Sequence, residues 1–232
     1  MTEHRPDYGL ADFEPAAPCH QDRLELVDGS EYTVLGEYRT WTDAYFVLYD
    51  QGATYGIPGS PQLRPVHVSR DLRERTFRVD TTELPLLAMA ESWLIARGCP
   101  PGAITLAGLP PADDTTRALE ARLRRNGDHF ALLASYTDDE KDSPEVVAML
   151  RSIDPKVRPE FRILLERFDP QSGTHTLREG AFATYERAVQ WWGAWMDGDD
   201  PPLPPPAPAV RGAVTTSVPI VPAPTVIWSP GR

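Results

Sequence analysis

The pattern of apolar and polar positions is clearest in the C-terminal third of the chain. Phe161–Phe168 alternates apolar and polar residues over its first half, which is typical of a half-buried strand. A turn is expected next, because Pro170 presets φ for a turn and Gly173 accepts positive φ. Thr174–Leu177 is the return strand, so this stretch predicts a β-hairpin.

A helix is predicted directly after this hairpin. Thr184 is suited to cap it, because its hydroxyl can accept a hydrogen bond from a free backbone N–H of the first turn. Trp191 lies off the predicted buried face and is therefore either a second contact or a candidate site for a partner. That buried face consists of residues that recur at helical spacing, namely Tyr185, Ala188, Val189, Trp192 and Trp195.

A shorter copy of this pattern occurs near the N-terminus, where Gly36–Ala44 repeats the order of residues found from Gly180 onward. It predicts a hairpin over Leu24–Val27 and Tyr32–Leu35, followed by a helix that Thr40 would cap. The buried face of this helix would hold Trp41, Ala44, Tyr45 and Leu48. The alternative is that Gly-x-aromatic-x-Thr is only an efficient way to leave a strand and cap a helix.

The middle of the chain alternates predicted strands and helices. Strands are expected at Val66–Val68, Thr76–Asp80 and His129–Ala134. Helices are expected between Thr81 and Gly98, over Thr115–Asn126, and from Ser143 onward. Gln51–Pro65, rich in glycine and proline, is a predicted long loop.

These elements predict an α+β protein with hairpin-plus-helix (ββα) units at both ends of one globular domain and disordered termini. The expected domain covers residues 22–197, and whether its two halves are a true repeat stays open. Residues 1–21 are a predicted flexible leader without the apolar segment of a signal peptide. Residues 198–232 form a predicted Pro-rich tail. Its Asp199–Pro206 run favours polyproline II, and the more apolar Thr215–Trp228 is expected to be disordered on its own.

Composition narrows the function classes. The 232-residue chain has a formal net charge of −11, which disfavours nonspecific binding to nucleic acid or anionic membranes. Its 41% hydrophobic residues suffice for a core, and no run approaches the roughly 20 apolar residues of a membrane helix. Two cysteines cannot build a disulfide framework. We therefore expect a soluble, acidic protein of the reducing cytoplasm without membrane contact, of open oligomeric state.

The segment Glu160–Trp195 also resembles the small arm-type DNA-binding domain of tyrosine recombinases. The resemblance rests on Asp-Pro-x-Ser-Gly at residues 169–173, a strand, Gly-x-Phe-Ala-Thr at residues 180–184, and an amphipathic helix. It implies DNA contact through the sheet, where basic residues neutralise phosphates. The matching strands carry both signs of charge, with Arg162, Arg167, His175 and Arg178 set against Glu160, Glu166, Asp169 and Glu179. This balance disfavours a nucleic-acid partner.

Candidate chemistry is sparse. Cys99 lacks a nucleophile motif, and Cys19-His20 shares no ligand spacing with the other histidines. The acidic run Asp138–Asp142 lacks the alternate spacing and central glycine of a calcium loop. Phosphate-cradling glycine loops and nucleophile elbows do not occur. The sequence therefore predicts no catalytic residue, no metal ligand and no cofactor.

Five residues are the candidate ligand- or partner-binding residues. Arg73 and Arg78 belong to the densest basic cluster, which suits a phosphate or an acidic partner. Trp191 is the tryptophan off the buried helix face. Leu203 and Trp228 lie in the tail, whose prolines suit groove-bearing partners.

The leading hypothesis is a non-enzymatic accessory protein that binds a protein partner through its domain face or its Pro-rich tail. Two alternatives stay open. One is nucleic-acid association through the ββα unit at residues 158–197. The other is a small-molecule enzyme with a site near the 51–65 loop, which a deep pocket lined by convergent polar groups would support.

Overall fold

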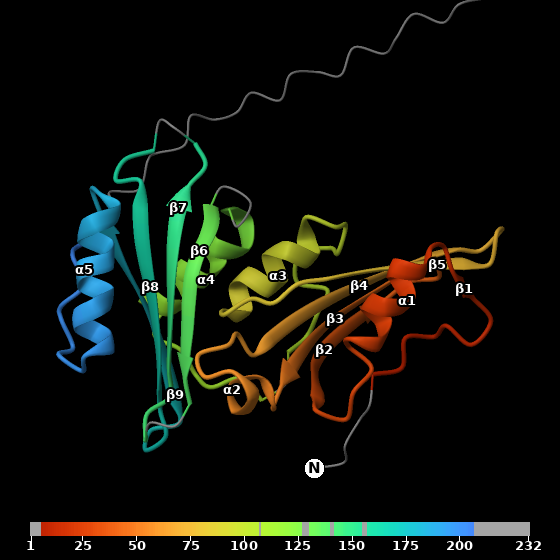
Figure 1. Cartoon of the computed structure of the whole chain (residues 1–232), viewed down its shortest axis with the longest axis horizontal. Helices are drawn as coiled ribbons and strands as arrows, with labels where there is room; N and C mark the ends of the chain where they lie inside the picture. Colours follow the sequence, from red (N-terminus) through yellow and green to blue (C-terminus); the bar gives the residue numbers. More distant parts are fainter. Residues whose placement is uncertain (1–5, 107, 127–129, 140–141, 155–156, 207–232) are drawn as a thin grey trace, which may run out of the picture.

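The computed structural model describes residues 6–106, 108–126, 130–139, 142–154 and 157–206. Within these residues, nine strands form two sheets, and five helices lie against the sheets or between them. Figure 1 shows the two sheets in opposite halves of the molecule, with helices α3 and α4 between them. The protein is therefore a layered α+β fold.

The first sheet, sheet A, has the strand order β1-β5-β4-β3-β2. An antiparallel meander makes up most of it, because short turns bring consecutive strands side by side. The short strand β1 is at one edge of the sheet and pairs in parallel with β5. The bounds are β1 (Glu14–Pro15), β2 (Tyr32–Arg39), β3 (Asp43–Asp50), β4 (Leu63–Asp71) and β5 (Thr76–Thr81).

The second sheet, sheet B, is a four-stranded antiparallel meander in the order β6-β7-β8-β9. Its last hairpin turns where the sequence indicates, with Gly173 at a φ of 63° and Asp169 Oδ1 accepting a bond from the Gln171 amide at 2.9 Å. The bounds are β6 (Phe130–Asp138), β7 (Glu145–Ser152), β8 (Phe161–Asp169) and β9 (Thr174–Phe182).

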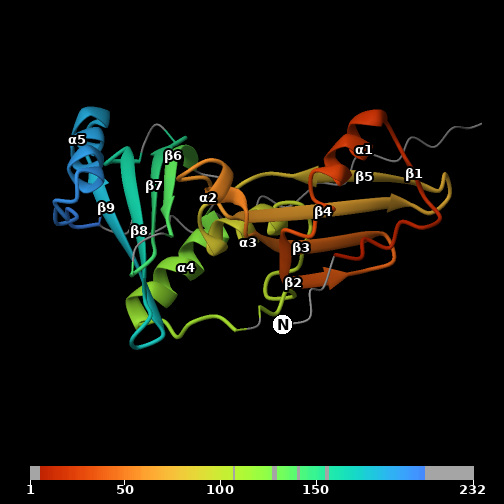
Figure 2. The same cartoon turned by 60° about the horizontal axis from the view of Figure 1, so that its bottom comes forward.

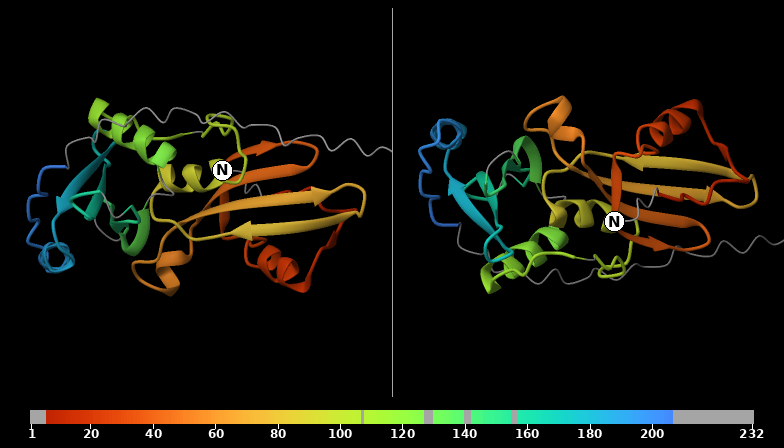
Figure 3. Two further views of the ribbon diagram at one scale, coloured as in Figure 1. Left: turned by 90° about the horizontal axis from the view of Figure 1, so that it is seen from above. Right: turned by 90° about the horizontal axis from the view of Figure 1, so that it is seen from below.

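The helices cover the faces of both sheets. Helix α1 (Pro18–Glu25) contacts β5, and the single turn α2 (Ala53–Gly56) lies between β3 and β4. Helix α3 (Leu87–Ile95) packs on β3 and β4, α4 (Asp114–Asn126) packs on β9, and these two helices contact each other. Helix α5 (Tyr185–Met196) covers the other face of sheet B (Figures 2 and 3).

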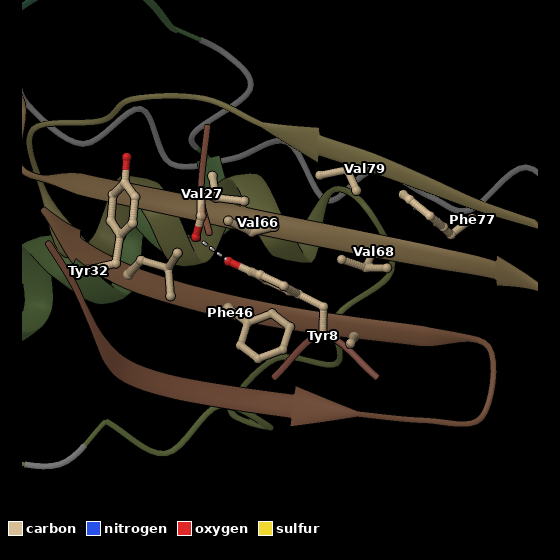
Figure 4. Close-up of a cluster of buried hydrophobic side chains, with 10 residues drawn as sticks. Tyr8, Val27, Tyr32, Phe46, Val66, Val68, Phe77 and Val79 are labelled. Atoms are coloured by element: carbon tan, nitrogen blue, oxygen red, sulfur yellow. Dashed lines mark hydrogen bonds between the residues drawn. The ribbon is translucent and has the colours of Figure 1, made fainter. Parts of the chain in front are cut away.

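Both faces of each sheet are therefore buried. On the α1 face of sheet A, the Tyr8 hydroxyl donates to the Val27 carbonyl at 2.7 Å above Phe46 (Figure 4). The remaining faces have cores of their own, built around Val47 and Leu94, Leu164 and Leu177, and Ile163 and Trp195. Burial on both faces explains why the central strands are apolar throughout.

The predicted α+β class with hairpin-plus-helix units is confirmed. The C-terminal unit consists of β8, β9 and α5, and the Thr184 side chain accepts a hydrogen bond from the Arg187 amide as expected of a cap. The predicted strand Thr76–Asp80 and helix Thr115–Asn126 correspond to β5 and α4. In the N-terminal half, a helix follows the β4–β5 hairpin and begins at Leu87.

Two predicted helices are strands. The segment after Thr40 forms β3, and the segment after Pro144 forms β7. Both strands are central in their sheets and carry nearly continuous apolar residues, which periodicity alone does not distinguish from a buried helix. The predicted strand Leu24–Val27 is also wrong, since Leu24 belongs to helix α1.

The two helix faces that were predicted to bury tryptophans also differ from the structure. Trp41 is 88% exposed at the tip of the β2–β3 hairpin, because it sits in a turn and not on a helix. On α5, the residues buried against sheet B are Ala188, Trp191 and Trp195, whereas Tyr185 and Val189 are exposed. The helix is thus rotated so that Trp191 faces the core.

Parts of both predicted flexible ends have defined structure. In the expected leader, Tyr8 is buried on sheet A, β1 pairs with β5, and α1 starts at Pro18. In the expected tail, residues 200–206 lie along β8 and β9. Apolar contacts and backbone hydrogen bonds hold both segments. Residues 1–5 and 207–232 lie outside the described part of the chain.

None of the described helices has the length and apolar character needed to cross a membrane.

Candidate functional site

A pocket of about 460 Å³ lies where the two sheets meet. Its walls come from both halves of the chain, including strands β2 to β4, helix α4 and all four strands of sheet B. Apolar side chains form much of the lining, namely Leu35, Leu63, Leu87, Leu109, Val146 and Phe168. Volume and lining match those of ligand sites in proteins, which are concave and mostly apolar with a few polar groups.

The polar end of this pocket is built on core-facing positions. Glu166 follows Leu164 by two residues on β8, and His175 precedes Leu177 by two residues on β9. Both leucines belong to the core beneath α4, and side chains two apart on a strand share a face. Glu166 and His175 therefore point toward α4, which contributes Glu120 to the same pocket.

The His175 ring is held from both sides. Its Nδ1 lies 3.1 Å from the Pro110 carbonyl oxygen, and its Nε2 lies 2.8 Å from Glu120 Oε1. A backbone carbonyl can only accept, so Nδ1 carries the hydrogen of that bond. This leaves Nε2 directed at the carboxylate. The backbone is fixed as well, because the His175 amide donates to the Pro111 carbonyl at 3.0 Å.

Glu166 is half-buried and differs from the buried carboxylates of the fold. Burial raises the pKa of its carboxyl from the ordinary value to about 7, and the nearby Glu120 adds to the rise while His175 opposes it. Across the described part of the chain, its side chain makes no hydrogen bond and no ion pair within 4.0 Å. An ionisable group in a pocket without a structural partner is a candidate for function.

Glu179 provides the comparison on the same strand face. Its side chain is 4% exposed, and its two oxygens accept from Arg122 at 2.5 Å and Arg162 at 2.6 Å. Buried charges are normally paired in this way. Glu179 is thus explained by structure alone, whereas Glu166 is not.

The 51–65 segment closes one side of the pocket. Gln62 Nε2 and Thr54 Oγ1 both donate to Asp139 Oδ2, at 2.9 Å and 2.6 Å. The Thr137 amide donates to the Gly59 carbonyl at 3.1 Å. These bonds attach the 51–65 segment of sheet A to strand β6 of sheet B. Gln62 and Leu63 of this segment form part of the pocket wall.

The predicted arginines are not part of this pocket. Arg73 is in the turn of the β4–β5 hairpin, at the end of sheet A that points away from sheet B (Figure 1). Arg78 lines a shallow hollow near that turn, together with Arg70 and Asp71. The 51–65 loop and the basic cluster, considered together in the sequence, are thus separated by the length of the sheet.

Two of the predicted partner-binding residues, Trp191 and Leu203, make contacts within the chain itself. The Trp191 indole N–H lies 3.1 Å from the carbonyl oxygens of both Pro201 and Pro202, and only 6% of Trp191 is exposed. Leu203 packs in the same cluster, over Gly180. A β-carbon at Gly180 would lie 2.7 Å from Leu203 Cδ2, so this glycine permits the close approach. Trp228 lies outside the described residues.

The basic residues that suggested DNA contact are paired with carboxylates. Arg162 pairs with Glu179, Arg178 with Asp113 at 2.5 Å, and Arg167 with Glu145 at 2.7 Å. Neutralised in this way, sheet B does not present the excess positive charge on which phosphate binding depends.

The two cysteines differ in environment, which leads to a labelling prediction. Cys99 is buried beneath sheet A, and burial raises the pKa of its thiol to about 11, whereas Cys19 is exposed. At pH 8 only about 0.1% of Cys99 would be thiolate, the reactive form. We expect 5,5′-dithiobis(2-nitrobenzoate) to titrate one thiol in native protein and two in urea. Rapid labelling of both thiols in native protein would contradict a structural role for Cys99.

Comparison with protein-family models, with curated proteins and with solved structures found no significant match for this chain.

Sequence reasoning did not group Glu120, Glu166 and His175. They come from a helix and two strands, and no fixed spacing joins them. One signal was present: charged residues at positions 166, 175 and 179 share the strand face of Leu164 and Leu177. Polar residues at core-facing positions need partners or a function.

Proposed function

We propose that this protein binds a small molecule in the pocket between its two sheets. The proposal takes up the third sequence hypothesis, a site near the 51–65 loop, and moves it away from Arg73 and Arg78. The ligand has an apolar body and one polar group. The apolar body fits the leucine-rich walls, and the polar group meets Glu166.

The unpaired carboxyl of Glu166 is the observation that carries this proposal. Leaving a desolvated ionisable group without a partner costs stability, and such groups are candidates for a role in ligand binding or in a reaction. The pocket also has the volume expected of a ligand site, about 460 Å³.

The test uses Nile red, a neutral apolar dye, as a probe of pocket occupancy. We expect saturable fluorescence enhancement in the full-length protein, and at least about tenfold weaker binding in Ala112→Trp, because the indole would occupy the pocket that Ala112 lines. Ala118→Trp is the matched control, since Ala118 is exposed on α4 and does not line the pocket. Equal Nile red affinity in wild type and Ala112→Trp would refute the proposal.

A second candidate keeps the protein-partner hypothesis at a different surface. Trp41 is 88% exposed and Leu72 is 53% exposed, on the two hairpin turns at the free end of sheet A. Arg73 lies in the same turn as Leu72, with a side chain that is 92% exposed. Exposed tryptophan and arginine are enriched where proteins bind one another. This candidate predicts that Trp41→Ser, and not Ala112→Trp, abolishes capture of a protein partner.

A further inference from the structure

We propose that Glu120, Glu166 and His175 form a binding site for a divalent first-row transition-metal ion at the polar end of the pocket. One ligand atom from each residue can be chosen so that all three lie within 4.8 Å of one another. Small movements of the carboxylates would bring all three atoms to the distances of about 2.0 to 2.2 Å that zinc requires. The ligands come from α4, β8 and β9, so the packing of the helix on the sheet builds the site.

The orientation of His175 is that of a metal ligand. Metal-binding histidines almost always donate their other ring N–H to a carbonyl or carboxylate, which fixes the tautomer and aims the free nitrogen. His175 has this arrangement, with Nδ1 donating to the Pro110 carbonyl and Nε2 at 2.8 Å from Glu120 Oε1, so that a metal ion would replace the proton that this pair shares in the metal-free protein. Glu120 is supported as well, because Arg124 Nη2 lies 3.5 Å from its second oxygen.

Glu166 supplies an independent reason for a cation. It lies on the same face of sheet B as Glu179, yet Glu179 pairs with two arginines, whereas among the described residues the Glu166 carboxylate forms no ion pair with an arginine or lysine. Glu120 and Glu166 bring two carboxylates to one half-buried cluster, and each offers an oxygen as a ligand atom. A divalent ion between them would balance both negative charges.

The donor set indicates the class of ion. One imidazole nitrogen with two carboxylates suits zinc, manganese or iron, whereas magnesium and calcium prefer oxygen ligands alone. Three protein ligands leave at least one coordination position for the pocket, as in catalytic zinc sites. The polar group of the proposed ligand could then coordinate the metal ion at this open position. The site concerns the same pocket as the proposed function, but metal binding and dye binding are measured separately.

The test is a calorimetric titration of the full-length protein with Zn²⁺ alone, after treatment with a chelator and its removal. The titrated protein carries Cys19→Ser, because exposed Cys19 next to His20 could bind zinc adventitiously. We expect one equivalent of Zn²⁺ to bind. Glu166→Gln and His175→Gln should each weaken Zn²⁺ binding at least about 100-fold, and a titration with Mg²⁺ should produce no saturable heat. Glu74→Gln is the matched control, an exposed carboxylate in the β4–β5 turn outside the cluster and the pocket, and should bind like the parent.

Substitution with Co²⁺ gives a spectroscopic readout that a general loss of folding would not imitate. We expect visible absorption bands in the parent and none in Glu166→Gln, whose far-ultraviolet circular dichroism should match that of the metal-free parent. Zinc affinity unchanged in Glu166→Gln, or binding that disappears with Cys19→Ser, would overturn the metal site. Nile red binding with no zinc binding would leave the pocket proposal standing and refute the metal site alone.

Discussion

Glu179→Gln is expected to lower the free energy of unfolding by about 3 to 5 kcal/mol, because it removes one partner from a buried ion cluster. The Glu179 carboxylate holds Arg122 and Arg162, and the Arg162 side chain is only 12% exposed. The glutamine amide would leave the guanidinium of Arg162 buried without a counter-charge. Urea denaturation followed by tryptophan fluorescence at pH 7.5 measures the change.

Glu74→Gln is the control for this prediction. Its carboxylate is 66% exposed and lies 3.7 Å from Arg73, which is also exposed. Such surface pairs contribute about 0 to 1 kcal/mol, so the control should unfold at nearly the wild-type urea concentration. A Glu179→Gln protein within about 1 kcal/mol of wild type would show that the cluster does not hold α4 on sheet B.

The opposite sign is expected for Glu166→Gln, which should stabilise the metal-free protein at alkaline pH. The pKa of Glu166 in the fold is raised to about 7, so the folded protein binds this proton more tightly than the unfolded chain does. Stability therefore falls as pH rises from the ordinary glutamate range to about 7, and stays low above it. Glutamine carries no charge and escapes this loss.

Linkage sets the size of the effect at about 3 kcal/mol at pH 8, falling to near zero at pH 4.5. Thermal and urea unfolding of wild type and Glu166→Gln across this range, with a chelator present, measure it. A constant difference between the two proteins at all pH values would mean that Glu166 does not titrate as its surroundings imply. A less stable variant at pH 8 would mean that the carboxylate has a structural partner.

The two glutamates together show what sequence pattern can and cannot identify. Alternation along β9 places Glu179 on the core face, but only the fold shows that Arg122 and Arg162 reach it. The same alternation places Glu166 on the core face and gives no hint that a partner is missing. Pairing across α4, β8 and β9 depends on tertiary packing, which local pattern does not encode.

The same distinction applies to the fold, because elements with local sequence signals were predicted and elements without such signals were not. The β8–β9 hairpin has a Pro-x-Ser-Gly turn and α5 has a threonine cap, and both were predicted at their observed positions. Strands β3 and β7 have neither alternation nor turn residues within them, because sheets and helices cover both of their faces. Their apolar runs fit a helix equally well, so the sequence assigned them wrongly.

The pocket joins segments that are far apart in the chain, with Leu35 and Tyr49 on one sheet and Val146 and His175 on the other. A ligand bound in the pocket would contact both sheets at once and hold them together. Its binding energy would then oppose their separation, by about 2.7 kcal/mol when the ligand is at 100 times its dissociation constant. Loading the pocket would in this way raise the temperature at which the two sheets separate.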